Sequence, residues 1–176
     1  MRYSLALLAS VAALAGYSPA NAAPLEQLAR DAVFRLCPEF MELETSIAEE
    51  ESAKALGFEA ADTRGHPRMG TLDVVSASSD EGRVWIANSR DASFCQVGIE
   101  GAKAKSVFDE IFADRGMLDE TLVVDPNVET PNPKLKLTSL RTPAIDKIYL
   151  GVQFVDMSGL TSTSSLVIQQ YLLQEE

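Results

Sequence analysis

The first 22 residues constrain the fold most, because they decide where it begins and in which compartment it forms. A positive charge at Arg2 precedes a short apolar run over residues 5–15, and Ala20-Asn21-Ala22 has the small-x-small pattern of a cleavage site. The run is shorter than the roughly 20 apolar residues that cross a bilayer. We therefore expect residues 1–22 to be a cleaved signal peptide and residues 23–176 to form a single globular domain, periplasmic or secreted.

Removal of this segment leaves 154 residues (176 minus 22) with 26 acidic and 14 basic side chains, because Arg2 is the one charge lost. A chain of this size can bury a sizeable core. Its acidic balance disfavours nucleic acid as a partner, since the two would repel each other at long range. No later apolar run is long enough to span a membrane, so we expect no transmembrane segment in the mature chain and an unknown protein or small molecule as partner.

Hydrophobic periodicity predicts both helices and strands. Helices are expected over residues 25–37, with a break or kink at Pro38, over about 40–56 on the surface, and over about 102–115. Strands are expected over residues 71–77, 83–88, 94–99, 119–124, 135–140, 148–155 and 166–173, the last with a short helix as the alternative. Loops are expected over residues 59–70, 125–133 and 158–165. The pattern predicts an α+β fold, an antiparallel sheet of about six to seven strands with two N-terminal helices and one inserted helix packed on one face.

The two cysteines are expected to form a disulfide. Cys37 follows Val33 by four residues and so shares the apolar side of the first helix, and Cys95 alternates with Val97 on the buried side of a strand. In an exported protein, a helix-to-sheet bridge between them is the natural outcome. Two buried free thiols are the alternative, and the absence of a Cys-x-x-Cys spacing disfavours a redox-active pair.

Three short patterns follow one another in the chain: Phe34-x-x-Cys37, Gly82-x-x-Trp85 and Cys95-x-Val97. Together they resemble small exported proteins of proteobacteria, over residues 30–100. The resemblance implies a shared helix-to-sheet disulfide scaffold and implies no activity.

No convincing catalytic or metal-binding pattern is present. His66, the only histidine, lies in a basic loop without a Gly-x-Ser-x-Gly elbow or a cluster of further ligands, so an exposed loop histidine is expected. The acidic run over residues 42–51 is expected to be a solvated helix face, because calcium loops need converging oxygens and a turn glycine. Residues 161–165 lack a general base at any readable spacing. We expect no catalytic residue, no metal and no cofactor.

Two aromatic residues are the candidates for ligand binding. Trp85 and Tyr149 alternate with the cleaner apolar rows of their strands, so they lie on the opposite sheet face. If that face is open, they would line a ligand groove; if helices cover both faces, they belong to the core. A local basic patch could bind an acidic partner or protect an edge strand: Lys134, Lys136, Arg141 and Lys147.

These patterns favour an exported, non-catalytic binding or protein-interaction module. The first alternative is a periplasmic hydrolase whose site is assembled from distant carboxylates or His66. The second is a structural component of the cell envelope.

Overall fold

The computed structural model describes residues 23–41, 46–66, 68–125, 128, 134–158 and 166–174. The predicted signal peptide, Glu42, Glu44 and the predicted loop residues 159–165 lie outside these ranges, as does most of the predicted loop over 125–133.

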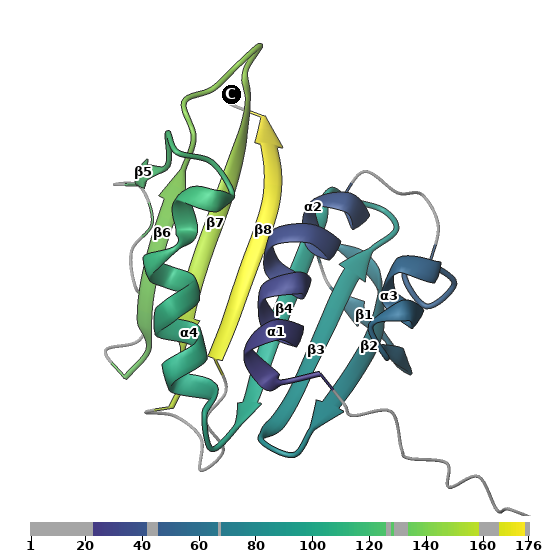
Figure 1. Cartoon of the computed structure of the whole chain (residues 1–176). Helices are drawn as coiled ribbons and strands as arrows, with labels where there is room; N and C mark the ends of the chain where they lie inside the picture. The colour runs from purple at the N-terminus through teal and green to yellow at the C-terminus, as the bar shows by residue number, and fades with distance from the viewer. Residues whose placement is uncertain are drawn as a thin grey trace, which may run out of the picture.

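One antiparallel sheet organises the chain, in the order β1-β2-β3-β4-β8-β7-β6-β5 (Figure 1). Its strands are β1 Glu59–His66, β2 Gly70–Ser79, β3 Gly82–Ser89, β4 Phe94–Gly101, β5 Val123–Val124, β6 Lys136–Arg141, β7 Ile148–Asp156 and β8 Leu166–Gln174. The predicted α+β class and antiparallel sheet are confirmed, and residues 166–173 form a strand as expected. The predicted strand number is wrong, because the sheet has eight strands.

The additional strand is β1, in a region predicted to be a loop. All eight of its residues are exposed, so the alternation of apolar and polar residues that marks a half-buried strand is absent. Backbone pairing with β2 forms it, with a bulge between Ala60 and Asp62. Bulges and charged side chains are common on edge strands, which they protect from pairing with other chains.

The N-terminal helix is longer than predicted. It runs as α1 (Leu25–Asp31), a π-helical turn (Ala32–Leu36) and α2 (Cys37–Phe40), so Pro38 does not end it. Pro38 is accommodated because the side-chain amide of Gln170 donates to the carbonyl oxygen of Val33, replacing the N–H that Pro38 lacks after the π-helical turn.

The other helices are shorter than predicted. The expected helix over 40–56 is wrong: among its described residues, Phe40 ends α2, residues 47–49 form a turn, and helix returns only in α3 (Glu51–Ala55). Its thin apolar stripe could not hold a long helix on the sheet. The expected helix over 102–115 is α4 (Ala104–Ala113), and the expected strand over 119–124 shrinks to β5, preceded by a turn.

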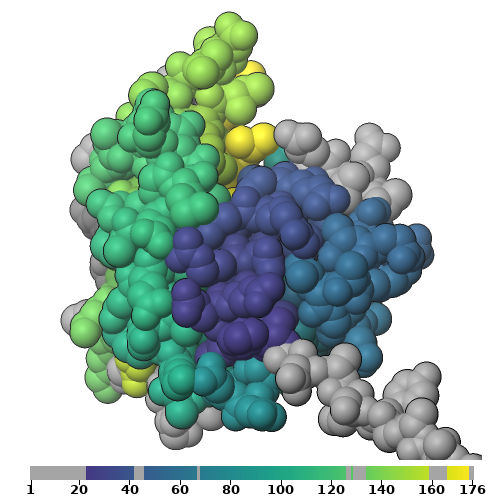
Figure 2. Space-filling view, viewed as in Figure 1, coloured from purple at the N-terminus to yellow at the C-terminus, as the bar shows by residue number. Residues whose placement is uncertain are grey.

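Each described α-helix contributes residues to one core on the same side of the sheet, which we call the inner face (Figure 1). Figure 2 shows this side, with α1 and α4 packed next to each other over the strands. A 2.6 Å ion pair between Arg30 and Asp114 joins their exposed edges. The sheet therefore has a covered inner face and an opposite outer face.

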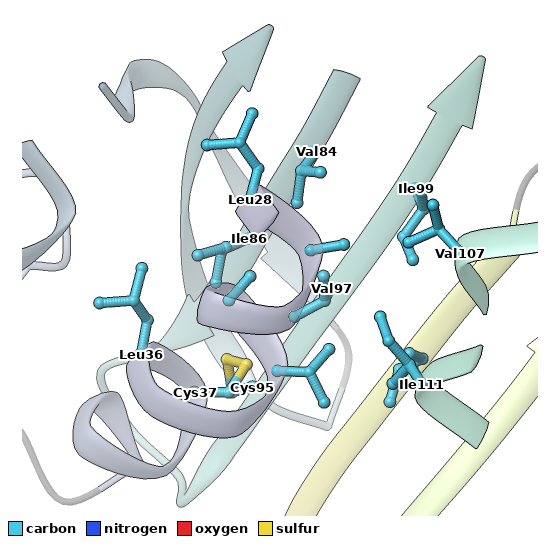
Figure 3. Packing of buried hydrophobic residues seen from close by; sticks show 14 of the residues in the cluster. Leu28, Leu36, Cys37, Val84, Ile86, Cys95, Val97, Ile99, Val107 and Ile111 are labelled. Atoms are coloured by element: carbon cyan, nitrogen blue, oxygen red, sulfur yellow. A yellow bond between two sulfur atoms is a disulfide. The ribbon is translucent and has the colours of Figure 1, made fainter. Parts of the chain in front are cut away.

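The disulfide crosses the centre of this core. Cys37 and Cys95 are bonded, with 5.5 Å between their Cα atoms, and both are fully buried (Figure 3). The bridge confirms the predicted helix-to-sheet disulfide. Because it encloses a separation of 58 residues, the chain-entropy model assigns it about 4 kcal/mol of stabilisation.

Candidate functional site

The outer face of the sheet carries a second, smaller apolar cluster made only of strand and loop residues. Its buried members are Leu72, Val74, Ala87 and Phe94, with Met69, Trp85, Ala92 and Tyr171 packed around them. No residue of a described helix takes part in it. Because no described helix covers this face, its side chains are available for contact with solvent or a ligand.

Trp85 lies flat on this face because its neighbouring strand has a glycine. A Cβ placed on Gly98 would lie 1.9 Å from the indole ring, so any other residue there would displace it. The indole Nε1 donates a 3.2 Å hydrogen bond to Glu100, which also forms a 2.9 Å ion pair with Arg83. These contacts hold the ring in one orientation while the residue stays half-buried.

Tyr171 repeats the arrangement on the other half of the sheet. Its ring lies on Gly151, where a Cβ would be 2.1 Å from the ring. Burial raises the pKa of the phenol, and interactions with Ser139 and Gln153 oppose this only in part. The hydroxyl of Tyr171 is therefore neutral at physiological pH and can both donate and accept a hydrogen bond.

A row of glutamines lies between the two rings. Gln96, Gln169 and Gln153 are direct cross-strand partners on β4, β8 and β7, and all three are half-buried. Within the described part of the chain, the side-chain amides of Gln96 and Gln169 make no hydrogen bond. We call the five residues Trp85, Gln96, Gln153, Gln169 and Tyr171 the outer-face patch. It is uncharged and combines aromatic surface with free amide groups.

The two aromatics predicted to line a groove are not brought together. Trp85 and Tyr149 both lie on the outer face. Followed across β4 and β8, however, the cross-strand partners of Trp85 lead to Val155 on β7. Tyr149 is six residues further along that strand, about 20 Å away at the usual rise per residue. It instead pairs with Leu173 and stacks beneath the guanidinium of Arg141, 5.5 Å from its ring centre.

Sequence reasoning missed Tyr171 and the glutamines as candidates. Alternation along β8 does place Gln169 and Tyr171 on one face, and this signal was available. The sequence does not give the strand order, which places β8 between β4 and β7 and so aligns the three glutamines.

His66 is exposed, as predicted, but it belongs to β1 instead of a loop. Its Nδ1 accepts hydrogen bonds from the backbone N–H groups of Arg68 (3.3 Å) and Met69 (3.1 Å), and its ring stacks on Phe94 with 6.2 Å between centres. The imidazole therefore closes the turn between β1 and β2.

Among the described residues, Asp73 on the inner face is the most buried carboxylate whose pKa is shifted. The hydrogen bond from Arg90 lowers the pKa of Asp73 most strongly, and burial opposes this. Arg90 binds both carboxylate oxygens, at 2.5 and 2.7 Å. Such a bidentate pair anchors the β3–β4 turn to β2.

A small hollow of about 170 Å³ lies between α4 and strands β6 and β7, below the usual size of ligand pockets. It is lined by Lys105, Phe108, Asp109, Phe112, Lys136, Thr138, Phe154 and Asp156. Burial opposes ionisation of Asp156, but hydrogen bonds from Ser158 and the charges of Lys105 and Lys136 outweigh it, so its pKa is lowered.

The predicted basic patch is spread out by the fold. Lys136 opens β6 beside this hollow, Arg141 closes the same strand, and Lys147 lies in the turn before β7. Lys134 precedes β6 and is exposed.

No protein-family model, curated protein or solved structure matches this chain. Its function is therefore inferred from the fold and the outer-face patch. Among the helices that the structure describes, none has the length and apolar character needed to cross a bilayer. The same residues contain no group of three or more His, Cys, Asp or Glu placed to hold a metal ion.

Proposed function

We propose that this protein is an exported, non-catalytic binding module and that the outer-face patch is its binding surface. The observation that carries the proposal is the pair of half-buried residues Gln96 and Gln169, whose side-chain amides make no hydrogen bond to another described residue. Neither amide is among the buried, unpaired polar atoms of the described residues, so both are accessible and can exchange water for the hydrogen bonds of a ligand.

The chemistry of the patch suits holding a ligand more than transforming it. Glutamine side chains do not titrate, and the raised pKa keeps the phenol of Tyr171 protonated at neutral pH. Neither group exchanges protons readily at that pH, which general acid–base catalysis requires. Both supply fixed donors and acceptors, which suit orientation and selectivity.

Export is supported by the bridge between Cys37 and Cys95, because disulfides persist mainly in oxidising compartments. It agrees with the expected signal peptide at residues 1–22 and with the resemblance to small exported proteins of proteobacteria. The periplasm is the compartment that we propose.

The test is a thermal-shift screen of the purified protein against defined classes of compound: neutral oligosaccharides, tripeptides, amino acids, fatty acids and nucleotides. A ligand that binds only the folded state raises the melting temperature by mass action. We expect at least one neutral polar class to do so, and mass spectrometry to recover that compound unchanged. The shift should disappear in Gln169→Ala and persist in Gln27→Ala, which removes an exposed glutamine from the helix layer.

Two results would contradict the proposal. Turnover of the bound compound would favour the hydrolase alternative. A complete absence of shifts, or shifts that survive Gln169→Ala, would remove the outer-face patch as the binding surface.

A further inference from the structure

We infer that the ligand of the outer-face patch is a neutral oligosaccharide, stacked on Trp85 and Tyr171 and hydrogen-bonded by the glutamines between them. This inference rests on the proposed function and adds the ligand class.

The orientation of the two rings is the first support. Gly98 and Gly151 let the rings of Trp85 and Tyr171 lie against the sheet, so one face of each ring contacts backbone. Both residues remain half-buried, as expected when the opposite ring face points away from the sheet. A sugar ring has an apolar C–H face that packs on such a flat aromatic surface, and its hydroxyl groups then project sideways.

The second support is the kind of hydrogen-bonding group. Each glutamine amide offers two donors and one acceptor oxygen, and the hydroxyl of Tyr171 offers both roles. Sugar hydroxyls also donate and accept, so they match these groups better than a ligand that only accepts. Gln96 and Gln169 are free to make these bonds within the described structure.

Charge argues against ionic ligands. None of the five patch residues is ionised. Charged side chains at its margin are engaged, because Arg83 pairs with Glu100 at 2.9 Å and Arg141, the cross-strand partner of Gly151, lies over the ring of Tyr149. A nucleic acid or another polyanion would meet a protein of net charge −11 without a cation in the patch. A neutral polar ligand avoids this repulsion.

The position within the sheet argues against a peptide that binds as an added strand. Such binding needs an open strand edge with free backbone groups. The glutamines lie on β4, β8 and β7, which are interior strands with partners on both sides. Only side chains on the face are available to a ligand here.

The spacing of the rings indicates an oligomer. Gly98 pairs with Val167 on β8, and Val167 pairs with Val155 on β7, which is four residues from Gly151. Gly98 and Gly151 are thus about 10 Å apart across the strands and about 13 Å apart along them. The glutamine row crosses β7 midway, at Gln153. One sugar ring cannot cover both platforms, whereas a chain of several can.

The test uses Trp85, the only tryptophan, as an intrinsic fluorescent probe of the patch. Chitohexaose, cellohexaose and maltohexaose are titrated into the purified protein, alongside N-acetylglucosamine and glucose. We expect at least one hexasaccharide to change the Trp85 emission and to bind at least tenfold more tightly than its monosaccharide.

Variants locate the binding. Gln169→Ala and Tyr171→Ala should each weaken hexasaccharide binding at least tenfold, whereas Gln27→Ala should leave it unchanged. Circular dichroism and melting temperature establish that each variant is folded. Gln96→Ala provides a second, milder change on the neighbouring strand and should also weaken binding.

The inference is overturned if none of the hexasaccharides changes the emission at millimolar concentration, or if binding survives Gln169→Ala and Gln96→Ala. In that case, binding of another compound class at the patch leaves the proposed function standing and corrects the ligand class. Failure of every class at the patch rejects both.

Discussion

The side-chain amide of Gln170 on β8 donates a 2.7 Å hydrogen bond to the carbonyl oxygen of Val33 in the π-helical turn. In a regular α-helix this oxygen would accept from Cys37, but the Cys37 N–H bonds to Ala32 instead. The next residue, Pro38, has no N–H to offer. Gln170 therefore supplies the donor that the helix cannot, and it ties the N-terminal helix to the sheet beside the disulfide.

We expect Gln170→Leu to lower the free energy of unfolding by about 1 kcal/mol, because the buried carbonyl of Val33 loses its partner. Removal of Gln170 Oε1, which is buried without a partner among the described residues, offsets this loss only in part. The loss should be smaller in a Pro38→Ala background, where the new N–H can reach that oxygen. Urea unfolding of the two single variants and the double variant measures this coupling. Gln169→Leu, on the outer face, serves as the matched control. Equal losses in both backgrounds would contradict the assignment.

The disulfide makes a second prediction. Replacing Cys37 and Cys95 together by alanine should cost about 4 kcal/mol, since the unfolded chain regains the freedom of the enclosed segment. Denaturant unfolding with and without reductant measures it. Reductant should destabilise the parent protein and leave the double variant unaffected; a parent insensitive to complete reduction would contradict the prediction.

Asp73 makes stability depend on pH. Its pKa is lowered in the folded protein, mainly by Arg90, so the unfolded state binds the proton first as the pH falls. The stabilisation is complete above the unfolded pKa near 4 and is lost as the pH falls through the lower folded value. Asp73→Asn should cost about 2 kcal/mol at pH 7. Urea unfolding from pH 7 to pH 2.5 should show this difference shrinking; a constant difference would contradict it.

Replacing the buried Asn88 by an apolar residue should stabilise the protein. Its side chain is 1% exposed, lies between Asp73 and Cys95 in register, and has neither amide atom hydrogen-bonded within the described residues. Asn88→Leu keeps the branching at Cγ, adds apolar volume and removes the unpaired groups, so we expect it to raise the free energy of unfolding by about 1 kcal/mol. Thermal and urea unfolding measure it. A loss of stability would show that the amide has a partner in solution.

A side chain at Gly98 should change the fluorescence of Trp85. Gly98→Ala places a Cβ where the indole of Trp85 lies, so the ring must move into solvent. We expect a red-shifted Trp85 emission and a loss of about 1–3 kcal/mol, as for other overpacked sites. Gly151→Ala is the matched control, because it displaces Tyr171 and should leave the tryptophan emission unchanged. Identical spectra for all three proteins would contradict the stacking.

Local patterns in the sequence were enough to predict the α+β class and the bridge between Cys37 and Cys95. Helical and strand periodicities decide which side of an element a residue occupies, and both cysteines fell on apolar sides. The same local reasoning failed for β1 and for the helix expected over 40–56. Every residue of β1 is exposed, so its strand form depends on its pairing with β2.

The outer-face patch was decided by tertiary structure alone. Alternation places Trp85, Gln169 and Tyr171 on one side of their own strands, but it does not say which strands are neighbours. The C-terminal strand β8 lies between β4 and β7, which are separated in the chain by α4, β5 and β6. Sequence therefore determined which side chains face inward or outward on each element. Only long-range strand pairing, whose contacts join residues far apart in the chain, determined which of them meet.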